Sequence, residues 1–110
     1  MKNQYFLKKQ SLNLAKKIVS SKKSKFFSTK PFKHLYIDEA LSNILLNDCL
    51  KHFPSESSNN WIKTNDKDVE IKYRSNWQSE FDIPNGIIDV VRILNSSLIL
   101  KAISETFNIK

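Results

Sequence analysis

The sequence predicts an α+β fold in which three main helices dominate and two or three short strands are added. Apolar residues recur at helical spacing in three stretches after residue 38, and shorter stretches alternate apolar and polar side chains. The length of 110 residues admits one modest domain at most. Because so few short strands cannot form a self-sufficient sheet, we expect the helices to lack a larger sheet to cover.

The N-terminal third is strongly basic. Residues 1–34 hold ten lysines and no acidic residue, whereas the whole chain carries a formal net charge of +7, so the rest is mildly acidic. An amphipathic helix is predicted over residues 4–20, from apolar residues at Tyr5, Leu12, Ala15 and Val19, with Leu14 and Ile18 beside them. Residues 20–25 have no apolar side chain and are predicted to form a solvated linker. We therefore divide the chain into a basic arm with its linker, residues 1–30, and a body, residues 31–110.

The first half of the body predicts a strand followed by a helix. Leu35 and Ile37 alternate with polar residues after Pro31, as in a short edge strand. Asp38 is the expected N-cap of the helix, and Pro54 is expected to stop it. Its apolar stripe is Leu41, Leu45, Cys49 and Phe53, widened by Ile44, Leu46 and Leu50.

The second half of the body predicts a strand and two helices after a polar loop at residues 55–60. Val69, Ile71 and Tyr73 alternate with charged residues, the pattern of a half-buried strand. One helix follows Pro84, with Ile87, Val90, Val91 and Leu94 on its stripe, and the capping pair Asn95–Ser96 leads into another, with Ile99, Ala102, Ile103 and Phe107. These stripes can cover each other only partly, so we expect exposed apolar surface and a broad unfolding transition.

Composition excludes several classes of function. A single glycine rules out glycine-rich phosphate loops, and a single cysteine rules out an internal disulfide and multi-cysteine zinc motifs. Lysines interrupt the apolar stretch that a secretory signal would need, and transit peptides favour arginine, which the arm lacks. We expect a cytoplasmic protein without a transmembrane span.

Few residues are candidates for chemistry, and for each a structural role is the favoured interpretation. His34 and His52 are the only histidines, and Cys49 lies three residues before His52, which could make a Cys/His pair. Burial of Cys49 as a small apolar side chain is preferred. The alternating carboxylates Asp66, Asp68 and Glu70 are interpreted as a solvated edge, and Asn95–Ser96–Ser97 as a chance glycosylation match. Trp61 and Trp77 are expected to anchor loops to the core.

Taken in order, several short motifs resemble one known family. They are Pro31-Phe32-x-His34-Leu35-x-Ile37-Asp38-x-x-Leu41, Phe53-Pro54, Trp61, Pro84, Leu94-Asn95-Ser96 and Phe107-Asn108-Ile109. Their order and spacing resemble the region that precedes the catalytic core in bacterial 2-oxoglutarate and iron(II)-dependent oxygenases of the prolyl-hydroxylase-like kind. The resemblance covers residues 31–110.

This resemblance implies a helical flank that packs on a double-stranded β-helix, or jelly roll, which this chain lacks. It also implies Fe(II) and 2-oxoglutarate as cofactors of the complete enzyme, with iron held by a His-x-Asp pair and a distal His. His34 is followed by Leu35 and Tyr36, and His52 by Phe53 and Pro54, so neither histidine can be carried over as a ligand. We predict no catalytic, cofactor-binding or metal-binding residue in this chain.

Two hypotheses of function result. The leading one is an N-terminal oxygenase fragment, inactive alone, that covers a jelly roll on a separate catalytic chain, as a truncated or split gene product would. The alternative is a small basic module that contacts anionic lipid or nucleic acid non-specifically through residues 1–34. A solvated, partly disordered extension is the favoured interpretation of the arm.

Overall fold

The structure is a computed structural model and describes residues 3–66 and 70–109. Four α-helices are present there, which are α1 (Gln4–Ser21), α2 (Asn43–His52), α3 (Ile87–Leu94) and α4 (Ser97–Phe107). Two antiparallel pairs of strands accompany them, β1 (Phe27–Ser28) with β2 (His34–Leu35) and β3 (Trp61–Asp66) with β4 (Glu70–Ser75), and a short 3-10 helix, η1, spans Glu80–Asp82. The helix-dominated α+β class is thus confirmed.

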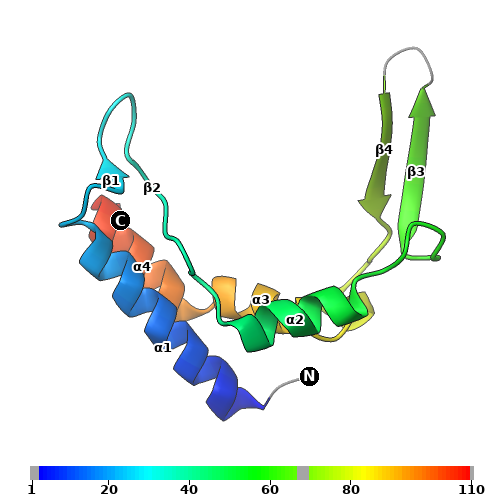
Figure 1. Cartoon of the computed structure of the whole chain (residues 1–110), viewed down its shortest axis with the longest axis horizontal. Helices are drawn as coiled ribbons and strands as arrows, with labels where there is room; N and C mark the ends of the chain where they lie inside the picture. Colours follow the sequence, from blue (N-terminus) through cyan, green and yellow to red (C-terminus); the bar gives the residue numbers. More distant parts are fainter. Residues whose placement is uncertain (1–2, 67–69, 110) are drawn as a thin grey trace.

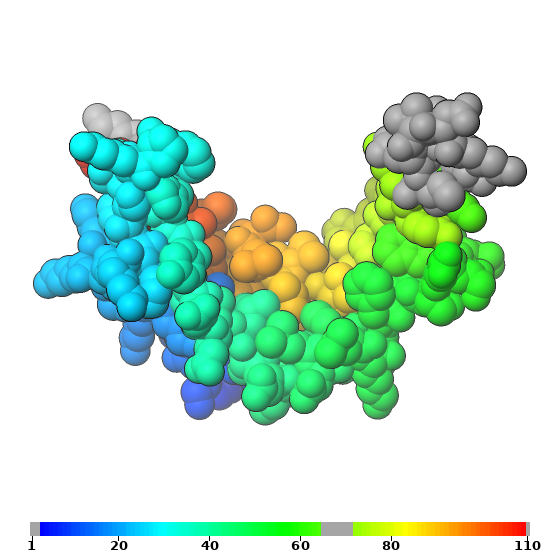
Figure 2. Space-filling view, turned by 45° about the horizontal axis from the view of Figure 1, so that its top comes forward, coloured from blue at the N-terminus to red at the C-terminus, as the bar shows by residue number. Residues whose placement is uncertain are grey.

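The elements form an open arch (Figure 1). Helices α1 and α4 lie side by side at one end beside the β1–β2 pair, α2 and α3 form the middle, and the β3–β4 hairpin rises at the other end. Figure 2 shows the hollow between the two raised ends. The radius of gyration is 16.9 Å, against about 13 Å for a compact domain of this length.

The core lies where α1, α3 and α4 meet and extends to one residue of α2. Its buried apolar side chains are Leu7, Leu14, Ile18, Leu45, Ile93, Ile99 and Ala102. Three of these come from α1, so this helix belongs to the packed core. The expectation of an arm separated from the body as a solvated extension is therefore wrong for residues 4–21.

The buried face of α1 also differs from the predicted one. Its buried positions are Leu7, Ser11, Leu14, Ile18 and Ser21, at the three- and four-residue spacing of one helix face. Tyr5, Leu12 and Val19, which were expected to form the apolar stripe, are exposed instead. The prediction counted large apolar residues, whereas the buried face of α1 includes two serines. The Oγ of Ser11 donates to the carbonyl oxygen of Leu7 at 2.8 Å.

Helix boundaries follow the predictions except at the start of α2. Ser42, and not Asp38, is the N-cap, because the Ser42 hydroxyl accepts from the backbone N–H of Leu45. Glu39 has a φ of 54°, so the chain turns between Asp38 and the helix and cannot be helical there. Helix α2 ends before Pro54, as expected, and Ser96 caps α4.

Both sheets contain a strand that the sequence analysis missed. The predicted edge strand is reduced to β2, and its partner β1 pairs Phe27 with Leu35. The predicted strand at residues 69–74 corresponds to β4, although Val69 lies outside the described residues, and its partner is β3, with Lys63 opposite Tyr73. Neither pair is large enough to cover the helices.

Coverage of the helical stripes is incomplete, as expected. Phe53, Leu94 and Ile103 belong to predicted buried stripes, yet they are 58%, 47% and 36% exposed. The accessible surface of the chain is 8445 Å², whereas a compact monomer of this mass exposes about 6,300 Å². The arch therefore exposes roughly 2,000 Å² more than a closed globule would.

Candidate functional site

His34 lies in β2 and is held by its own loop. Its Nδ1 lies 2.8 Å from the carbonyl oxygen of Phe32, and its ring packs edge-on against the Phe32 ring at 5.4 Å between centroids. The second histidine is on a different element, at the end of α2. The structure therefore gives His34 contacts that fit a structural role.

His52 and Cys49 lie on the same helix, but they contact different groups. The Nδ1 of His52 lies 3.1 Å from the carbonyl oxygen of Asp48 and 3.4 Å from its carboxylate. The thiol of Cys49 donates to the carbonyl oxygen of Gly86 at 3.2 Å. Cys49 thus joins α2 to the start of α3, as a half-buried packing residue.

The contact between α2 and α3 is unusually close at Gly86. A Cβ at this position would lie 2.7 Å from the carbonyl oxygen of Asp48 and 3.0 Å from the backbone nitrogen of Cys49. Gly86 also has a φ of 81° and forms the N-cap of α3. The only glycine of the chain is therefore required both by its backbone conformation and by the neighbouring helix.

A buried carboxylate lies beside this contact. Asp89 in the first turn of α3 is completely buried, and its charge and that of Asp48 act on the thiol of Cys49. The pKa of Cys49 is raised, first by burial and then by these two carboxylates. A raised pKa keeps the thiol protonated at neutral pH, which argues against a nucleophilic role for Cys49.

The two tryptophans anchor a loop to the β3–β4 hairpin. The indole N–H of Trp61 donates to the carbonyl oxygen of Ser55 at 2.9 Å, and that of Trp77 donates to Asn60 Oδ1 at 2.8 Å. Tyr73 donates its hydroxyl hydrogen to Glu56 in the same loop. The tryptophans hold the loop at residues 55–60, as predicted, but they join it to the hairpin and not to the core.

The alternating carboxylates fall at the end of the hairpin. The backbones of Asp66 and Glu70 are register partners, whereas Asp68 and the side chains of residues 65–71 lie outside the described part of the structure. The interpretation of these carboxylates as a solvated edge stays a prediction.

The described residues do not fit the iron site that the resemblance implies for the complete enzyme. Within them, no three side chains of His, Cys, Asp or Glu lie close enough together to hold a metal ion. His34 and His52 sit on separate elements, and the carboxylate nearest His52 belongs to the same turn of α2. No reaction step is therefore derived from Fe(II) or 2-oxoglutarate on this chain.

Exposed apolar side chains on α2 form the surface best suited to contact another protein. Leu46, Leu50 and Phe53 recur at four- and three-residue spacing, and all three are exposed. We call these three residues the α2 face. Leu45, on an adjacent face, is fully buried against the core, so the helix is fixed while the α2 face remains uncovered.

Sequence reasoning singled out the lysines of residues 1–34 but missed two exposed apolar surfaces, the α2 face and a row of apolar residues on α1. Leu46 and Leu50 were assigned to the edge of a buried stripe, and the apolar residues of α1 were assigned to its packing face. The seven-residue spacing of Tyr5, Leu12 and Val19, parallel to that of Leu7, Leu14 and Ser21, signals two faces on one helix.

None of the helices within residues 3–66 and 70–109 is both long and apolar enough to cross a bilayer. Comparison with protein-family models, with curated proteins and with solved structures finds no match to this chain.

Proposed function

We propose that this chain is the helical N-terminal segment of a prolyl-hydroxylase-like 2-oxoglutarate and iron(II)-dependent oxygenase. In this proposal it is inactive alone and covers a jelly roll on a separate catalytic chain, which holds the iron and hydroxylates its substrate while 2-oxoglutarate is oxidatively decarboxylated. The single unpaired Cys49 supports the cytoplasmic location that goes with it.

The observation that carries the proposal is that this chain exposes more surface than a compact monomer of the same mass. The accessible area of 8445 Å² is roughly 2,000 Å² above that of a compact monomer. Stable protein interfaces bury about 1,200–2,000 Å² summed over both partners, and obligate interfaces bury more. The excess on this chain alone therefore suits a permanent packed interface.

The α2 face supplies the apolar centre that such an interface needs. Leu50 is 74% exposed and Phe53, the C-cap residue of α2, is 58% exposed, and the helix is held to the core by the fully buried Leu45 on an adjacent face. Apolar side chains on a fixed helix lose little conformational freedom when a partner covers them. A sheet packed on α2 would bury them at low entropic cost.

The residues that carry the resemblance also lie at boundaries of the fold. Phe53–Pro54 ends α2, and Asn95–Ser96 joins α3 to α4. Residues at the ends of helices help to set the angle between one helix and the next. The order of these motifs along the sequence therefore reflects how the helices are arranged. This supports a likeness in architecture for residues 31–110.

The test combines this chain with a jelly-roll chain that carries a His-x-Asp pair and a distal His. The coding sequence adjacent to that of this chain is the first place to look for such a partner. Alone, the chain should bind a hydrophobic dye and lose its helix signal over a broad range of urea concentration. Together, the two chains should copurify, exclude the dye and unfold in one sharp transition.

Matched variants locate the interface. Leu50→Gln on the α2 face should weaken copurification, whereas Leu100→Gln, which changes an exposed leucine of α4, should leave it intact. The proposal fails if the chain alone is monomeric, excludes the dye and unfolds in one steep two-state step. It also fails if the chain alone binds Fe(II) at a one-to-one site of micromolar affinity in anaerobic calorimetry.

A further inference from the structure

A second uncovered surface runs along the outer side of α1. Tyr5, Leu12 and Val19 recur every seven residues there, away from the buried stripe, and all three are exposed. Two adjoining grooves follow this row. One lies on α1 around Tyr5, and the other lies between α1 and α4 around Val19 and Leu98, with a volume of about 560 Å³.

Lysines line both grooves. Leu12 and Lys16 are shared by the two, which makes them one continuous surface that we call the lysine groove. Its cationic side chains are Lys8, Lys9 and Lys16 of α1, Lys23 just after α1, and Lys101 of α4. Glu105 is the one acidic residue in the described lining, so the surface is strongly positive.

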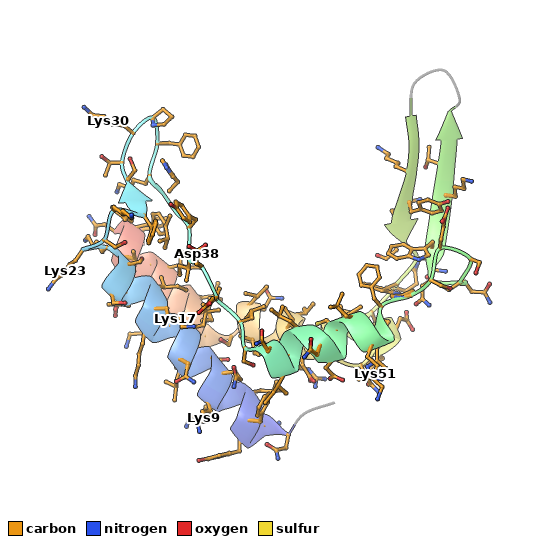
Figure 3. The ribbon with its side chains drawn as sticks, viewed as in Figure 1. Lys9, Lys17, Lys23, Lys30, Asp38 and Lys51 are labelled. Carbon is orange, nitrogen blue, oxygen red and sulfur yellow. The ribbon has the colours of Figure 1, made fainter. Side chains whose placement is uncertain are left out.

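These lysines differ from Lys17 on the other side of α1. Lys17 donates to the backbone carbonyl oxygen of Glu39 at 2.6 Å and so fixes the segment before α2. In Figure 3, Lys17 lies beside the segment that contains Asp38, whereas Lys9 and Lys23 point away from the body. These two lysines of the groove are therefore directed outward.

We propose that the lysine groove docks the chain onto the surface of an anionic lipid bilayer. Lysines on the groove would lie among the headgroups, while Leu12, Val19 and Tyr5 would enter the boundary of the acyl chains. This is peripheral contact, with α1 lying in the plane of the interface. It is independent of the proposed oxygenase role, because the lysine groove and the α2 face share no residue.

The composition of the groove favours lipid over nucleic acid. Its cations are all lysines, which act as point charges. Its lining contains no arginine, whose guanidinium group can form bidentate hydrogen bonds with a phosphate. Leucine and valine side chains lie between the lysines. A nucleic-acid backbone would leave them exposed to water, whereas the boundary of a bilayer would bury them. Charge and apolarity on one face fit a lipid surface.

The size of the expected effect follows from the lysines. Each lysine near an anionic bilayer strengthens binding about five-fold, and the attraction falls off within a Debye length of about 8–10 Å at physiological salt. Removal of two groove lysines should therefore weaken binding about 25-fold. Raising the salt concentration should weaken it further.

The experiment is flotation of the full chain with vesicles of phosphatidylcholine, either pure or containing about one-third phosphatidylserine. We expect binding only to the anionic vesicles. Lys8→Gln with Lys16→Gln should abolish most of it, whereas Lys30→Gln with Lys51→Gln, which removes the same charge elsewhere, should not. Both control lysines are exposed, and Figure 3 shows them away from α1.

A second pair of variants tests the apolar part. Leu12→Gln with Val19→Gln should weaken vesicle binding while helix content stays unchanged, and Leu50→Gln with Leu100→Gln should leave vesicle binding as it is. This separates the inference from the oxygenase proposal, since Leu50→Gln should affect only the pairing with a jelly roll.

Several results would overturn the inference. One is absence of binding to anionic vesicles at low salt. Another is an equal loss of vesicle binding in the control variant Lys30→Gln with Lys51→Gln, which would show that net charge and not the groove causes the binding. Tighter binding to duplex DNA that ignores Leu12→Gln with Val19→Gln would assign the groove to nucleic acid. Self-association that disappears in this variant, without vesicle binding, would assign the groove to a second copy of the chain.

Discussion

Substitution of Gly86 by alanine tests the close contact between α2 and α3. The new Cβ would lie 2.7 Å from the carbonyl oxygen and 2.8 Å from the carbonyl carbon of Asp48, both backbone atoms that no rotamer change can move. The φ of 81° adds a second penalty, because an L-residue with a side chain rarely adopts it. Both effects act in the same direction.

The magnitude is the sum of two terms. A positive φ costs about 1–2 kcal/mol for a residue with a Cβ, and overpacking against rigid neighbours costs about 1–3 kcal/mol. Gly86→Ala should therefore lose about 2–5 kcal/mol, a large part of the 5–15 kcal/mol typical of a folded domain. In urea this lowers the midpoint of the helix signal, even where the transition of the chain alone is broad.

The assay is the urea midpoint of the far-ultraviolet circular dichroism signal, compared at one protein concentration. Asn85→Ala is the matched control, because Asn85 is exposed beside Gly86, and its midpoint should stay close to that of the original chain. If Gly86→Ala has the same midpoint as Asn85→Ala, then the chain does not approach itself so closely at this point, and the described junction of α2 and α3 is wrong.

Two further predictions concern α2. Leu45→Ala should lower the urea midpoint by the equivalent of about 2–5 kcal/mol, since Leu45 is fully buried, whereas Leu50→Ala, at an exposed position of the same helix, should change it by less than about 0.5 kcal/mol. Equal effects would contradict the orientation of the helix. The raised pKa of the Cys49 thiol means that the folded state holds its proton more tightly than the unfolded state does. This contribution to stability is present below the unfolded pKa and is lost as the pH rises through the folded pKa, so the midpoint should fall above about pH 8.5, and the fall should be smaller in Cys49→Ala. An identical decline in both proteins would show that other groups cause it.

Element types in the body could be predicted because their patterns are local. Periodic apolar residues and terminal signals such as Pro54 and Ser96 fix α2, α3 and α4 to within a few residues. The start of α2 was misplaced because Asp38 and Ser42 are both good N-caps, and a turn at Glu39 decided between them. That turn is linked to the hydrogen bond from Lys17, a contact between residues far apart in the sequence.

The packing of α1 and the surfaces of the fold could not be predicted in the same way. Ser11 and Ser21 are buried on the packed face of α1, and no local pattern marks a serine as a core-facing residue. Strand β3 was missed because Thr64 and its neighbours have no apolar alternation, and its pairing with β4 decides its conformation. The α2 face and the lysine groove depend on which sides of α1 and α2 the core leaves open.

The β3–β4 hairpin stands apart from the helices, and this separation affects local unfolding of the chain. Within the described residues, its strands pair extensively only with each other, and a few ring contacts and hydrogen bonds at its base, such as Phe53 against Trp61 at 5.9 Å, join it to the rest. The hairpin can thus open without unfolding of the helical core, and only its own pairing protects its amide hydrogens from exchange. We therefore expect amide hydrogen exchange to reach the hairpin backbone long before it reaches Leu45 or Ile93 in the core.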